Sequence, residues 1–131
     1  MNNRANPINP AWPIILTFLV IMGWMPYEGF LPRVLAVGIV ITLFWAFTFF
    51  RQDILRSFGP TQRLAVFGAM AGLAAPAVIL GLMVLKTGVH AHGPEFTPAE
   101  ISWTVQQFFI WPFVGGLVGF GSSFLGQSLS S

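Results

Sequence analysis

Long apolar stretches without charge alternate with short segments that hold every charged residue. Four uncharged stretches are long: residues 5–27, 34–50, 64–85 and 101–131. An α-helix needs about 20 mostly apolar residues to cross a hydrocarbon core of about 30 Å. The last two stretches meet this requirement, and the second meets it if Arg33 extends to the headgroups. The pattern therefore predicts membrane-spanning helices over residues 32–50, 63–86 and 99–122.

The first stretch is less clearly a span, because its continuous apolar run covers only residues 14–25, between Pro13 and Pro26. A run of this length is typical of a re-entrant or signal-like segment. A helix that continued from Ala11 to Phe30 through a kink at Pro26 would reach spanning length. No small-residue cleavage pattern follows the run, so we expect no cleaved signal peptide.

The basic residues favour four spans over three. Four spans divide them four to two across the membrane, with Arg4, Arg51, Arg56 and Arg63 opposite Arg33 and Lys86. Three spans divide them evenly, which the positive-inside rule disfavours. We therefore expect an all-α integral membrane protein, one domain over residues 1–131, with a short or kinked first helix over 11–30 and both termini in the cytoplasm. Three spans plus a re-entrant segment is the alternative.

Composition agrees with this prediction and excludes other classes. Hydrophobic residues make up 55% of the chain and charged residues 8%, whereas soluble domains carry about 25% charged residues. The net charge of +2 comes from scattered basic residues, so no nucleic-acid-binding patch is expected. The chain has no cysteine, which excludes disulfides, thiolate chemistry and c-type haem attachment.

Local signals mark helix starts and interruptions. Thr97-Pro98-Ala99-Glu100 is a capping box with proline at the first helical position, and Gly59-Pro60 predicts another helix start. Pro76 and Pro112 fall inside predicted helices, where each frees a backbone carbonyl. Tryptophans near predicted helix ends are typical of an interfacial belt: Trp12, Trp24 and Trp103.

Small residues recur at helical spacing in the third and fourth predicted helices. They are Gly68, Gly72 and Ala75 in one, and Gly115, Gly119 and Ser122 in the other. Membrane helices associate where small side chains let backbones approach closely, so these positions predict helix-packing faces. Packing within the chain is favoured, and packing against another subunit stays open.

Gln106 and Gln107 are the most polar residues expected within a span. We expect them to form a hydrogen bond between helices or with a carbonyl freed by Pro112. A pore-lining or substrate-binding role is the alternative.

His90 and His92, followed by Glu95, are the only group with metal-ligand chemistry. Two histidines in a turn without a third ligand at fixed spacing do not predict a metal site. They stay weak candidates for binding a cofactor such as haem, and the identity of any cofactor is unknown.

No enzymatic motif is found, and every charged residue lies at or outside a predicted helix end. Ion pathways usually display an ionisable residue within a span. We therefore expect a non-catalytic accessory subunit, not an enzyme, that packs with lipid and with other membrane subunits or copies of itself. A respiratory or photosynthetic complex in a bacterial inner or equivalent membrane is one setting. The alternatives are a small homo-oligomeric channel or transporter, and a haem- or quinone-binding membrane anchor.

Overall fold

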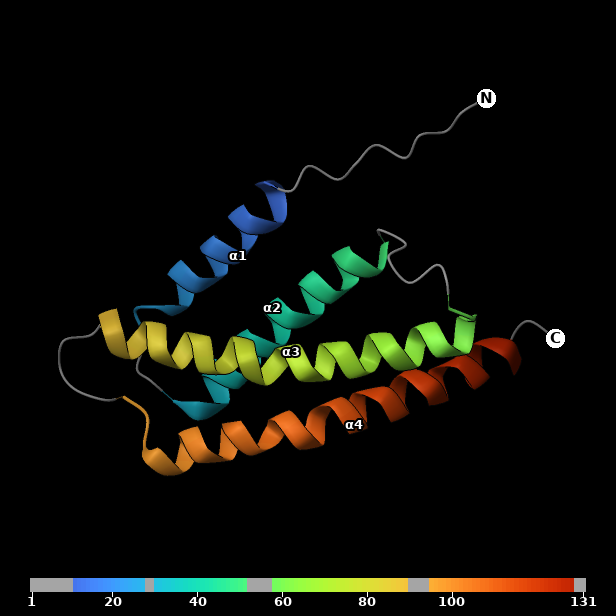
Figure 1. Ribbon diagram of the computed structural model, residues 1–131. Coiled ribbons are helices and arrows are strands. Elements are labelled where there is room, and N and C mark those ends of the chain that lie inside the picture. Colours follow the sequence, from blue (N-terminus) through green and yellow to red (C-terminus); the bar gives the residue numbers. More distant parts are fainter. Residues whose placement is uncertain (1–10, 28–29, 52–57, 90–94, 129–131) are drawn as a thin grey trace.

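The structure is a computed structural model that describes residues 11–27, 30–51, 58–89 and 95–128. This part of the chain is all helical, as the sequence predicts, and contains no strand (Figure 1). It forms four helices, α1 Ala11–Trp24, α2 Leu31–Arg51, α3 Pro60–Val89 and α4 Pro98–Ser128.

Three of the four helices are long and apolar enough to cross a membrane. The qualifying segments are Leu31–Phe49, Pro60–Val89 and Pro98–Leu125. Helix α1 has 14 residues, which corresponds to about 21 Å at 1.5 Å per residue. It is shorter than the hydrocarbon core of about 30 Å.

The expectation that the first helix continues from Ala11 to Phe30 is wrong. Helix α1 ends at Trp24, and the Tyr27 amide then donates to the Trp24 carbonyl in a turn, at 3.0 Å. Proline disfavours helical geometry at the residue before it and has no amide hydrogen to donate. Pro26 therefore stops the helix instead of kinking it.

The predicted helix starts at Gly59-Pro60 and Thr97-Pro98 are confirmed. The Thr97 amide donates to Glu100 Oε2 at 2.7 Å, and the Glu100 amide donates to Thr97 Oγ1 at 3.2 Å. This reciprocal pair is the capping box. Pro60 occupies the first position of α3, and the Arg63 amide donates to the Gly59 carbonyl at 2.8 Å.

The helices form two antiparallel pairs that cross each other at an angle (Figure 1). Helices α3 and α4 run side by side along their length, whereas α1 and α2 diverge from them. Helix α2 packs on α3, and α1 packs mainly on α2. The Trp45 indole of α2 donates to Thr17 Oγ1 of α1 at 2.9 Å, which links this second pair.

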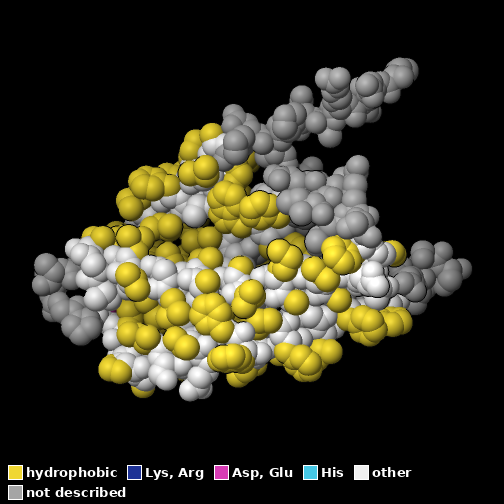
Figure 2. Space-filling view, in the orientation of Figure 1, with side chains coloured by type: hydrophobic (Ala, Val, Ile, Leu, Met, Phe, Trp, Pro, Cys, Tyr) yellow, Lys and Arg dark blue, Asp and Glu magenta, His cyan; other side chains and the backbone are white. Residues whose placement is uncertain are grey.

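The buried core lies where α1 and α3 end and where α2 and α4 begin. Its members are Trp24, Val34, Ile41, Ile79, Leu82, Met83 and Phe96. Elsewhere the surface is apolar, and the face in Figure 2 consists mainly of hydrophobic side chains and backbone. Because one end holds the core, α1 and α2 are anchored there and separate from α3 and α4 toward the other end.

Candidate functional site

Glycines hold α3 and α4 in backbone contact. A Cβ added to Gly68 would lie 2.7 Å from the Gly115 carbonyl carbon, and one added to Gly115 would lie 2.9 Å from the Gly68 carbonyl carbon. Gly72 faces Trp111 and Pro112, and Gly119 faces Leu64 in the same way. The four glycines predicted to form packing faces therefore lie at one interface within the chain, which we call the glycine seam.

The other two predicted packing positions differ from each other. Ala75 is buried, at 6% exposure. Ser122 is exposed, and its hydroxyl donates to the Val118 carbonyl of its own helix at 2.7 Å. The adjacent Ser123 is the buried serine, and its hydroxyl donates to the Phe120 carbonyl. The structure therefore places Ser122 outside the helix contact and Ser123 inside it.

An apolar groove of about 510 Å³ lies between α2 and the glycine seam. Its floor is α3, with Phe67 and Ala71, and its walls are α2 and α4. The hydroxyl of Thr42 in one wall donates to the Gly38 carbonyl of its own helix at 2.7 Å. The Ser122 hydroxyl is also satisfied within its own helix. Because both hydroxyls already donate to backbone carbonyls, the groove is suited to hydrocarbon or to apolar side chains.

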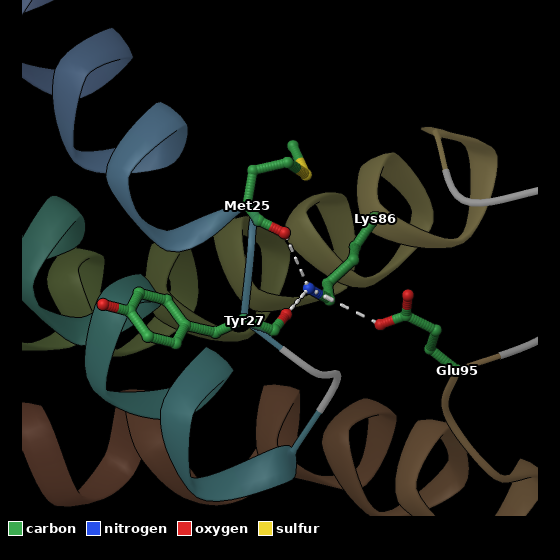
Figure 3. Close-up of polar contacts among 4 residues, drawn as sticks. All are labelled: Met25, Tyr27, Lys86 and Glu95. Atoms are coloured by element: carbon green, nitrogen blue, oxygen red, sulfur yellow. Dashed lines mark hydrogen bonds and ion pairs between the residues drawn. The ribbon is translucent and has the colours of Figure 1, made fainter.

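Among the residues that the structure describes, Lys86 is the one charged residue that is buried. Its side chain is 0% exposed, and its ammonium donates to the backbone carbonyls of Met25, at 3.1 Å, and Tyr27. Glu95 Oε2 lies 3.6 Å from the same nitrogen (Figure 3). The ammonium also lies 4.9 Å from the centroid of the Trp24 ring, within the range of a cation–π interaction.

This arrangement ties three parts of the chain together. Lys86 is in the last turn of α3, the two carbonyls follow the C-terminal end of α1, and Glu95 precedes α4. A cation is favourable at a helix C-terminus, where backbone carbonyls lack intrahelical partners. The ammonium therefore satisfies carbonyls that Pro26 and the following turn remove from a regular helix.

Sequence reasoning placed Lys86 at a helix end but did not predict its burial. The sequence feature that indicates this burial is the spacing of three apolar residues on the same helical face as Lys86. Ile79, Leu82 and Met83 lie seven, four and three residues before it. All three are buried. Trp24, expected in an interfacial belt, is 6% exposed, and its indole nitrogen has no hydrogen-bond partner among the described residues.

The two adjacent glutamines of α4 occupy different environments. Gln107 is 6% exposed, and its side-chain nitrogen donates to the Trp103 carbonyl at 3.0 Å. This bond lies within α4, neither between helices nor at the Phe108 carbonyl freed by Pro112. Gln106 is exposed.

His90 and His92 lie outside the described residues. Among the residues that the structure does describe, no group of three or more His, Asp or Glu side chains could hold a metal ion. Comparison with protein-family models, curated proteins and solved structures found no match to this chain. The structure thus defines a class, an all-helical chain with three helices long and apolar enough to cross a membrane.

Proposed function

We propose that this chain is a non-catalytic integral membrane subunit that packs into a larger membrane protein assembly. The observation that carries the proposal is the partial packing of its helices. Only 6% of the apolar segment of α4 is buried within the chain, whereas 28% of the apolar segment of α3 is buried. The groove of about 510 Å³ between α2 and the glycine seam adds a concave apolar surface.

The short α1 supports the same proposal. Its large side chains are apolar and more than half exposed at Trp12, Ile14, Phe18 and Leu19. A hydrophobic helix shorter than the hydrocarbon core is accommodated by bilayer thinning, snorkelling or association with other helices. Association fits this helix because no charged residue occurs between residues 11 and 24 to extend to the headgroups.

The proposed setting is an energy-converting membrane such as a bacterial inner membrane. The chain would cross it four times, with α1 antiparallel to α2 and the short length of α1 accommodated by association with other helices. The four-to-two division of basic residues would put the segment between α2 and α3 in the cytoplasm, together with both termini.

The test is purification of the tagged full-length chain from its native membrane in mild detergent, followed by native mass spectrometry. We expect stable complexes that contain other membrane polypeptides. Ala71→Phe would fill the groove and should reduce the recovery of those polypeptides, whereas Ala74→Phe, on the same helix outside the groove, should not.

Two outcomes would contradict the proposal. Recovery of the chain without foreign subunits would favour the homo-oligomeric alternative. Solute flux through liposomes that contain only this chain, lost in a folded Gln106→Leu/Gln107→Leu variant, would favour a channel, because removing its polar lining dewets a pore.

A further inference from the structure

The side of α4 that faces away from α3 carries one polar residue within an apolar stripe. Gln106 and Gly115 are nine residues apart, about two and a half turns, and so lie on opposite faces of the helix. Since Gly115 faces α3, Gln106 faces outward. Spacings of three and four residues place exposed aromatic and aliphatic side chains on the same outward face: Phe109, Phe113, Leu117, Phe120 and Phe124. We call this set, with Gln106, the outer stripe.

In the proposed membrane orientation, the Gln106 amide would lie below the headgroups, where water is scarce. It follows Glu100 by six residues, which corresponds to about 9 Å along the helix axis. No charged residue follows Glu100 in the chain. In the part of the chain that the structure describes, the Gln106 side chain makes no hydrogen bond, whereas Gln107 bonds within its own helix. A surface that covers the outer stripe must therefore offer both a donor and an acceptor near Gln106.

We infer that the outer stripe is a self-association face, occupied by the outer stripe of a second copy of this chain. Copies inserted in the same orientation carry Gln106 at the same depth. A carboxamide is both donor and acceptor, so two related by a two-fold axis can bond reciprocally. The phenylalanines that follow would pack around this pair as offset or edge-to-face rings, the geometry already present in the Phe120–Phe124 pair at 5.0 Å.

This inference does not depend on the larger assembly. The groove lies on the other side of α4, between the glycine seam and α2. Foreign subunits could occupy the groove whether or not the outer stripe is paired. The two proposals can therefore fail separately.

Disulfide crosslinking in membranes tests the self-association face, because the chain has no native cysteine. The reporters are Phe113→Cys and, as a second position on the stripe, Leu117→Cys. The matched control is Met70→Cys on α3, which is 59% exposed. It lies at the depth of Phe113, because Gly68 packs on Gly115 and Gly72 packs on Trp111.

We expect both reporters to give an oxidised product of twice the 14.4 kDa chain mass, and the control to stay monomeric. Adding Gln106→Leu should lower the dimer association constant by about threefold to thirtyfold, the factor that intramembrane hydrogen bonds contribute. Adding Gln107→Leu should leave dimerisation unchanged. Gln106→Leu places an apolar side chain at an exposed position, and circular dichroism would verify that the variant is folded.

Each other result would overturn the inference. Monomer at both reporters would show that lipid covers the stripe. A crosslinked product of another mass would identify a different protein as the occupant. Equal crosslinking at Met70→Cys, or dimers insensitive to Gln106→Leu, would show that contact between copies does not use this face.

Discussion

Replacing Gly119 by alanine should weaken the pairing of α3 and α4. The added Cβ would lie 2.6 Å from the Leu64 carbonyl carbon, with the carbonyl oxygen closer still. Ordinary contact begins at 3.4 Å, so the helices must separate by at least about 0.8 Å at this point. A gap of 0.5–1 Å already forfeits about a quarter to a half of each dispersion contact.

The expected cost follows from this displacement. Overpacking of a well-packed interior costs about 1–3 kcal/mol, and the obstacle here is backbone, which cannot rotate away as a side chain would. Alanine is favoured over glycine within a helix by up to about 1 kcal/mol, which offsets part of that cost. We therefore compare Gly119→Ala with Gly121→Ala, whose added Cβ would meet nothing within 4 Å. The gain in helix propensity is the same in both variants. The difference of about 1–3 kcal/mol between their free energies of unfolding therefore measures the cost at the contact between α3 and α4.

The assay is reversible unfolding of the purified chain in mixed micelles by titration with sodium dodecyl sulfate, followed by circular dichroism. Gly119→Ala should unfold at a lower detergent fraction than the wild-type chain, and Gly121→Ala at the same or a higher fraction. Equal midpoints for the two variants would refute the assignment of Gly119 to the α3–α4 contact.

Three further predictions concern Lys86, the α4 cap and topology. Lys86→Met should lower the free energy of unfolding by about 3 kcal/mol in the same titration, because it leaves buried carbonyls and Glu95 without the ammonium; an unchanged midpoint would contradict this role. Thr97→Ala should lower the free energy of unfolding by about 1 kcal/mol and speed amide exchange in the first turn of α4, whereas Thr97→Ser should preserve the capping box. Equal exchange rates in the two variants would argue against a stabilising role for the Thr97 hydroxyl. In intact cells, an impermeant thiol reagent should label a single cysteine introduced at His92 but not at Asn3, Ser57 or Ser130; labelling at Asn3 would show that the first segment does not place the N-terminus in the cytoplasm.

The sequence alone determined the features that depend on neighbouring residues. Helix starts at Pro60 and Pro98 are fixed by caps within three residues of each start. Spanning length follows from uninterrupted apolar stretches, and three helices have it. The end of α1 was also encoded locally, by Pro26, but the requirement for a full span led to the wrong expectation of a helix as far as Phe30.

Tertiary structure alone decided which side of each helix faces inward. Gln106 and Gln107 are chemically identical neighbours, yet about 100° of helical rotation buries one and exposes the other. The spacing of glycines predicts a packing face but does not name its partner, whereas the structure joins Gly68 to Gly115 and Gly119 to Leu64. The burial of Lys86 depends on carbonyls 59 and 61 residues away. Such contacts depend on how the helices are rotated and paired, which no local pattern specifies.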